Sequence, residues 1–184
     1  MSSAEAGRAQ LAANASRPDE MAPRQLGADG WVVNVVIAGL GGQGVLKAAA
    51  ILADVAFRAG FDVKKSEIHG MSQRGGSVTS DVRFGRKVFS PMVPRGQADF
   101  LVVLGQGQGE SARPLLKAGG VLIEPDPALE SRLASKKSLN VALLGVLARH
   151  LDLGDQLWHS ALQAALPEKL QAANLQAFAL GKTP

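Results

Sequence analysis

The feature that most constrains the fold is an apolar run that ends in a cluster of glycines. Val32 to Ala38 is rich in β-branched side chains, as in a strand buried on both faces of a parallel sheet. The turn Gly39 to Gly44 follows directly and contains four glycines. From Val45 to Ala59, apolar side chains recur at intervals of three and four, which predicts a helix. Strand, glycine turn and helix in this order predict a nucleotide-type α/β fold.

The rest of the chain predicts further strands and a helical end. Phe61 to Lys65 is a short second strand, so residues 32–65 form a strand–helix–strand unit with parallel strands. Ser77 to Phe84 alternates, and a turn at Gly85-Arg86-Lys87 leads into Val88-Phe89-Ser90, which predicts an antiparallel hairpin. The remaining expected elements are strands at 98–104 and 121–123, a helix at 110–118 with Pro114 in its first turn, and helices from 140, over 155–166 and from 167. We therefore expect an α/β, Rossmann-like mixed sheet, mostly parallel with an antiparallel hairpin edge, flanked by helices and ending in a helical C-terminus.

Length and composition indicate one globular domain. Residues 1–29 form a flexible N-terminal extension by composition, and residues 30–184 form the domain. No apolar run is long enough for a membrane span, and no secretory signal is evident, so we expect a cytoplasmic protein. The chain has no cysteine and only three scattered histidines, which argues against a metal site. A net charge of +4 with 4% aromatic residues argues against binding of nucleic acid.

The polar segment from Ser66 to Ser77 is the best candidate for binding chemistry. His69 either moves a proton or shapes the glycine loops by hydrogen bonding. Glu67 lies on the same side of an extended chain as His69, and it either orients His69 or pairs with Arg74. Arg74, beside exposed backbone N–H groups, either binds an anion or forms an interface salt bridge. The neutral donors Gln73 and Ser77 would suit the same anion or a partner backbone.

The Gly39 to Gly44 turn also satisfies the G-x-G-x-x-G spacing of dinucleotide-binding loops. The acidic residue that should end the second strand is missing, however, because that region reads Asp62-Val63-Lys64-Lys65. Lys64 or Lys65 would suit a 2′-phosphate, which leaves an NADP-binding alternative open. Otherwise the glycines serve strand–helix packing and close approach by a ligand or a partner. Lys136 and Lys137 are interpreted as solvated surface.

Both glycine segments resemble a known family. Residues 39–46 and 66–78, together with Ser90-Pro91 and Ala98-Asp99, resemble the gamma-type domain of 2-oxoacid:ferredoxin oxidoreductases. The Glu-Ile-His-Gly-Met-Ser-Gln-Arg-Gly-Gly form is most similar to the small (beta) subunit of indolepyruvate ferredoxin oxidoreductases. The resemblance extends over about residues 32–181.

The resemblance implies an accessory subunit that binds no cofactor alone. Thiamine diphosphate with Mg and the 4Fe-4S clusters would reside on a large partner subunit, and coenzyme A would be the co-substrate at a shared site. The complex would convert indolepyruvate or another aryl pyruvate into the acyl-CoA and CO2, and would reduce ferredoxin. The resemblance also implies that the two glycine segments contact coenzyme A, the substrate or the partner's active site. The candidate residues for these contacts are Gly39, Gly41, Gly42, Gln43, Gly44, Gln73, Arg74, Gly75, Gly76 and Ser77.

Two departures from the family pattern leave the substrate open. Gly105 to Gly109 stands where the family usually has an aromatic or acidic residue before a Pro-containing helix start. The segment between Ile123 and Asn140 is also shorter than expected. Phenylpyruvate, another aryl oxo acid and branched-chain oxo acids therefore stay open as alternative substrates to indolepyruvate. The alternative functions are a stand-alone NAD(P)-dependent oxidoreductase and a non-catalytic assembly module for the large subunit.

Overall fold

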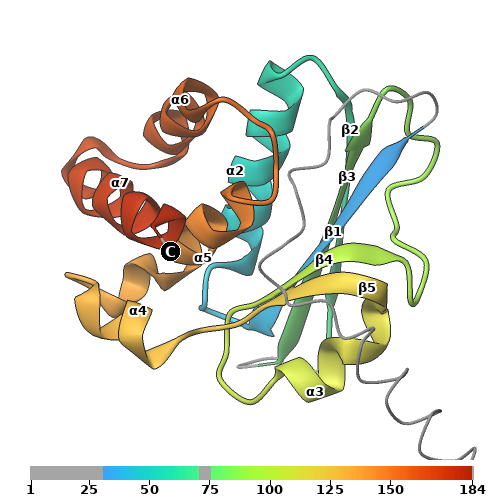
Figure 1. The fold of residues 1–184 in the computed structure, drawn as a ribbon, viewed down its shortest axis with the longest axis horizontal. Helices are drawn as coiled ribbons and strands as arrows, with labels where there is room; N and C mark the ends of the chain where they lie inside the picture. Colours follow the sequence, from blue (N-terminus) through green and yellow to red (C-terminus); the bar gives the residue numbers. More distant parts are fainter. Residues whose placement is uncertain (1–30, 71–75, 184) are drawn as a thin grey trace, which may run out of the picture.

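The computed structural model describes residues 31–70 and 76–183. Its centre is a five-stranded sheet in the order β2-β3-β1-β4-β5, and helices α2, α5, α6 and α7 gather on one face of that sheet (Figure 1). The strands are β1 (Val32–Leu40), β2 (Asp62–His69), β3 (Ser77–Gly85), β4 (Ala98–Val103) and β5 (Leu116–Ile123). The helices are α2 (Val45–Arg58), α3 (Gly109–Ala112), η2 (Arg113–Leu115), α4 (Pro127–Arg132), η3 (Lys136–Ser138), α5 (Leu139–Ala148), α6 (Asp155–Ala165) and α7 (Glu168–Lys182).

The predicted mixed sheet is confirmed. β4 runs parallel to both of its neighbours, β1 and β5. β3 runs antiparallel to both β1 and β2, so it alone opposes the direction that the other four strands share. The antiparallel part forms one edge of the sheet, as expected, and the helical C-terminus is present from α5 onward.

Two details of this edge differ from the prediction. β1 and β2 are parallel, but β3 is inserted between them, so they are not neighbours. The hairpin joins β2 to β3, and residues 88–90 form no strand. Instead, Asp62 Oδ2 accepts a hydrogen bond from Val88 N at 2.9 Å, and Arg83 donates to the carbonyl of Ser90 at 2.9 Å. Backbone groups of residues 88–90 are thus bonded to side chains and not to a neighbouring strand.

The predicted helix at 110–118 is wrong in length. α3 ends at Ala112, a 3-10 turn contains Pro114, and β5 begins at Leu116. Proline lacks the N–H that would continue the α-helical hydrogen bonds, which explains the early end. α4 was not predicted, although Asp126 caps it by accepting from Ala128 N at 2.9 Å.

The main core lies between the sheet and the helices. Val33, Val35 and Ile37 of β1 point into it and are fully buried. Trp158 of α6 packs on Phe178 of α7 with ring centroids 5.3 Å apart. No helix within residues 31–70 and 76–183 combines the length and the apolar character that a membrane span requires.

A smaller core lies on the opposite face, where a segment without regular structure crosses the sheet. This second cluster includes the buried side chains of Val36, Leu101 and Val103, and Val93 packs against it. Asp81 Oδ2 holds the crossing segment by accepting from Val93 N at 2.8 Å. Burial raises the pKa of Asp81, while the bond from Val93 opposes that rise. The carboxylate therefore anchors the segment at an electrostatic cost.

The raised pKa of Asp81 gives a prediction for stability. A carboxyl group whose pKa is higher in the folded state than in the unfolded state stabilises the fold only when it is protonated. Stability from this group is thus lost as the pH rises through the raised pKa. Asp81→Asn keeps an acceptor for Val93 N without the charge, so its thermal midpoint at pH 7 should equal or exceed that of the wild type. Asp81→Ala should cost about 1 kcal/mol, because it leaves the partly buried Val93 N–H without its partner.

Thermal denaturation at pH 7 and at about pH 4 tests this, since about pH 4 is where an unfolded Asp titrates. Acidification should raise the stability of the wild type relative to Asp81→Asn. Equal losses for the Asn and Ala variants at pH 7 would show that the charge itself holds the segment.

Candidate functional site

The glycine turn after β1 closes on itself. Gln43 N donates to Leu40 O at 3.1 Å, and the Gln43 side-chain oxygen accepts from Leu40 N at 2.6 Å. Gly42 and Gly44 have φ values of 93° and 84°, and residues other than glycine rarely adopt this backbone conformation. A Cβ at Gly39 would lie 2.8 Å from the Gln43 side-chain oxygen. The Gln43 side-chain oxygen is thus used within the turn, where it accepts from Leu40 N. The groups that the turn can offer to a ligand are therefore those of its backbone.

Two other parts of the chain approach this turn. Gly41 N donates to the carbonyl of Gly76 at 3.0 Å, just before β3 begins at Ser77. Asn140, at the start of α5, donates from Nδ2 to the carbonyl of Gly44 at 3.3 Å. The structure therefore brings the two glycine segments of the sequence into contact, and it adds Asn140 to them.

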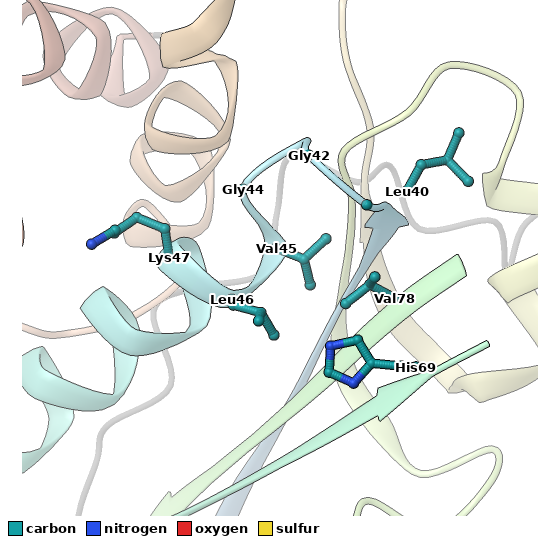
Figure 2. Close-up of a pocket in the computed structure, with 9 residues that line it drawn as sticks. Leu40, Gly42, Gly44, Val45, Leu46, Lys47, His69 and Val78 are labelled. Atoms are coloured by element: carbon teal, nitrogen blue, oxygen red, sulfur yellow. The ribbon is translucent and has the colours of Figure 1, made fainter. Parts of the chain in front are cut away.

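A cavity of about 450 Å³ opens beneath the turn. The strand register places Gly39, Val78 and His69 in one row across β1, β3 and β2. Figure 2 shows the side chains of Val45, Val78 and His69 gathered below the turn. The cavity is lined by Leu40, Gly41, Gly42, Gly44, Val45, Leu46, Lys47, His69 and Val78. Its walls are mostly apolar, and His69 supplies an exposed imidazole at the end of β2.

Glu67 and His69 lie on the same side of β2, because residues two apart on a strand share a face. Glu67 Oε1 accepts from Lys65 Nζ at 2.6 Å. The Lys65 ammonium lowers the pKa of Glu67, and the nearby His69 lowers it to a smaller extent. Glu67 is therefore an ionised surface carboxylate whose hydrogen-bonding partner is Lys65.

Part of the second glycine segment lies outside the described residues, namely Gln73, Arg74 and Gly75. Ser77 is the first residue of β3, and its carbonyl accepts from Gly70 N at 2.7 Å, which closes the end of the β2–β3 hairpin.

The NADP alternative finds no geometric support. Lys64 pairs across the sheet with Arg83, which in turn faces Asn34 near the start of β1. A ribose phosphate bound at the glycine turn would lie at the opposite end of β1, far from Lys64. Lys64 also forms an ion pair with Asp62 at 2.6 Å.

Several lining residues were not found from the sequence. Leu46, near the start of α2, is 37% exposed at the mouth of the cavity. Lys47 follows it and donates to the carbonyl of Ala165 at 3.1 Å. A helical period identifies the core face, but it does not reveal which edge of that face borders a cavity.

The fold is that of the gamma-type domain of 2-oxoacid oxidoreductases. A 2-oxoglutarate:ferredoxin oxidoreductase from Magnetococcus marinus, with 2-oxoglutarate, coenzyme A and succinyl-CoA bound, matches with a TM-score of 0.71 at 20% identity. The match covers 82% of this chain but only 30% of that one. The gamma subunit of a keto/oxoacid ferredoxin oxidoreductase from Geobacter sulfurreducens matches with a TM-score of 0.68 at 24% identity, over 81% of this chain and 95% of that one.

Sequence comparison gives the family. Residues 34–129 match the model for pyruvate ferredoxin/flavodoxin oxidoreductase. Indolepyruvate oxidoreductase subunit IorB of Thermococcus kodakarensis is 33% identical over 190 aligned positions, which cover 80% of this chain and 93% of the relative. The same subunit of Pyrococcus horikoshii is 50% identical over 91 positions, covering 48% and 44% of the two chains. The chain belongs to the pyruvate ferredoxin/flavodoxin oxidoreductase family, and the resemblance drawn from its motifs is confirmed.

The contact between Gly44 and Asn140 gives a prediction. Ala at Gly42 or Gly44 would adopt a positive φ, at a cost of about 1–2 kcal/mol in each case. A Cβ at Gly42 meets open space, whereas one at Gly44 would collide with the Asn140 side chain. Gly44→Ala should therefore lower the free energy of unfolding, measured with urea, more than Gly42→Ala does. In an Asn140→Ala background the two penalties should become equal, and an unchanged difference would contradict the contact.

Proposed function

We propose that this chain is the small accessory subunit of a 2-oxoacid:ferredoxin oxidoreductase that acts on indolepyruvate or another aryl pyruvate. The products are the acyl-CoA, CO2 and reduced ferredoxin. The catalytic groups reside on a large partner subunit, and this chain completes the shared site with its glycine turn and His69. The names of the relatives that match over most of this chain support the oxo acid class.

The observation that carries the proposal is an apolar rim around the cavity beneath the glycine turn. Leu40 and Leu46 line this cavity and are 38% and 37% exposed. Large apolar side chains grouped around a concave site are typical of a surface that another protein covers. A partner seated on this rim would enclose His69 and the glycine turn.

The residues of this chain do not fit the metal cofactors of the proposed reaction. The chain has no cysteine, and thiolates are the ordinary ligands of iron–sulfur clusters. Among the residues that the structure describes, no group of three His, Asp or Glu side chains lies close enough to bind a metal ion. We therefore assign thiamine diphosphate, Mg and the 4Fe-4S clusters to the partner.

Coenzyme A is the proposed ligand on this chain's side of the shared site. The Magnetococcus marinus enzyme of the same fold contains bound coenzyme A. In our proposal, the backbone N–H groups of the glycine turn and the Arg74 guanidinium face a phosphate or carboxylate of the shared site. Glycine turns and arginine forks both suit such oxyanions.

Reconstitution tests the function. We expect oxo-acid-dependent and coenzyme A-dependent dye reduction only when this chain and its large subunit are co-expressed. The highest kcat/KM should be for indolepyruvate among indolepyruvate, phenylpyruvate and 2-oxoisovalerate. Full turnover by the large subunit alone would make this chain an assembly module. Turnover by this chain alone with NAD(P) would replace the proposal with the stand-alone oxidoreductase.

Substitution in the apolar rim tests the docking surface. Leu46→Asp places a charge in the proposed interface, so it should weaken binding to the large subunit by about tenfold or more. Phe57→Asp is the matched control, because Phe57 is 70% exposed on the same helix but does not line the cavity. Surface plasmon resonance with immobilised large subunit measures both. Equal affinities for the two variants would place the interface elsewhere.

A further inference from the structure

The outer edge of β2 is a row of backbone groups without a strand beside it. β2 is the terminal strand of the sheet, and among the residues that the structure describes it pairs with β3 alone. That pairing runs without a shift of register from Asp62 to His69, so the open edge is regular over its whole length. An edge of this kind can pair with a strand of another chain.

The hydrogen bonding of the hairpin shows which residues of β2 face the open edge. Gly70 N donates to the carbonyl of Ser77, so Gly70 directs its backbone groups toward β3. Successive residues of a strand direct their backbone groups to alternate sides. The residues that direct their N–H and C=O groups outward are therefore Val63, Lys65, Glu67 and His69.

The side chains along this edge carry both signs of charge. Lys65 and Glu67 are exposed, share one face of β2 and form an ion pair in which Nζ and Oε1 are 2.6 Å apart. Lys64 pairs in the same way with Asp62 on the other face. Lysines on an edge strand commonly keep other strands away. Here each lysine is matched by a carboxylate two residues away, so the edge does not repel a strand by its net charge.

A two-fold axis at Ser66 makes this edge complementary to itself. Two copies related by an axis perpendicular to the sheet pair as antiparallel strands, and residues that lie opposite each other share a face. With the axis at Ser66, Lys65 of each copy lies opposite Glu67 of the other. An axis at Lys65 or at Glu67 would place that residue opposite its own copy, and like charges directly opposite destabilise a strand pair. The charges therefore select one register.

The other pairs of this register are compatible with it. Val63 lies opposite His69 of the second copy, and both direct backbone groups outward. His69 contributes its backbone to this pair, so its imidazole stays beside the cavity beneath the glycine turn (Figure 2). On the other face, Ile68 is 47% exposed and lies opposite Lys64 of the second copy, whose methylene chain can cover it.

We propose that this chain forms a homodimer through its β2 edges, with the two-fold axis at Ser66. The two sheets join into one continuous sheet by strand addition. Each Lys65 lies between two carboxylates, Glu67 of its own chain and Glu67 of the second copy, so the four charges alternate. The inference goes beyond the proposed function, because it concerns this chain without the large subunit. A complex with that subunit would then contain two copies of each chain.

Sedimentation equilibrium of the full chain alone tests the dimer. Strand pairing buries little area, so we expect a weak dimer whose weight-average mass rises from one chain toward two as the concentration is raised to about 1 mM. Lys65→Glu places like charges opposite each other and should weaken dimerisation by about tenfold or more. Lys65→Glu/Glu67→Lys restores the alternation and should dimerise as the wild type does. Hydrogen exchange of the outward amides of β2 should slow as the dimer forms.

Lys169→Glu is the matched control, because it makes the same change of net charge on an exposed residue of α7. It should dimerise as the wild type does. Both single variants lower the positive charge of the chain and thus its general self-repulsion, so weakening by Lys65→Glu alone would report a local contact.

A chain that stays monomeric up to about 1 mM would overturn the inference and would leave the edge to the large subunit. A dimer that Lys65→Glu does not weaken would overturn it too, because the contact would then lie elsewhere. A double exchange that stays as weak as Lys65→Glu would contradict the register at Ser66. Because the chain is measured alone, failure here would leave the turnover test of the reconstituted complex unaffected.

Discussion

Backbone contacts of the Gly39–Gly44 turn hold the candidate site together. Gly41 bonds to the segment that precedes β3, and the carbonyl of Gly44 accepts from Asn140 of α5. A Cβ at Gly44 would collide with the Asn140 side chain and would obstruct the second of these contacts. The positive φ at Gly42 and Gly44 lets the chain turn tightly from strand into helix. The turn thus links the end of the β2–β3 hairpin and the start of α5 to the end of β1.

The insertion of β3 between β1 and β2 decides which residues lie beside the glycine turn. In a fully parallel sheet, β2 would lie beside β1 and would end close to the glycine turn, as in dinucleotide-binding domains. Here β3 separates them, and His69 at the end of β2 reaches the turn across Val78. The residues that would contact a ribose are replaced by an apolar wall and an exposed imidazole. The same glycine spacing therefore serves a different site.

The turn also separates two kinds of surface. The cavity with His69 is mostly apolar and has exposed leucines at its mouth. A second cavity beside Gly42 and Gly44 is lined by Lys136 and Lys137 and is positively charged. A protein partner suits the first, because burying apolar area stabilises association.

The sequence by itself determined the strand–turn–helix unit, the mixed sheet, the helical end and the family, because these rest on local periodicity, on glycines and on a long motif. It did not determine that residues 88–90 form no strand, because hydrogen bonds to Asp62 and from Arg83 hold that segment. It also did not determine that the helix near Glu110 is short, which follows from Pro114. Only the tertiary structure brought Lys136, Lys137 and Asn140 to the glycine turn. Contacts between residues so far apart depend on how α5 packs against the sheet, and no local pattern encodes that distance.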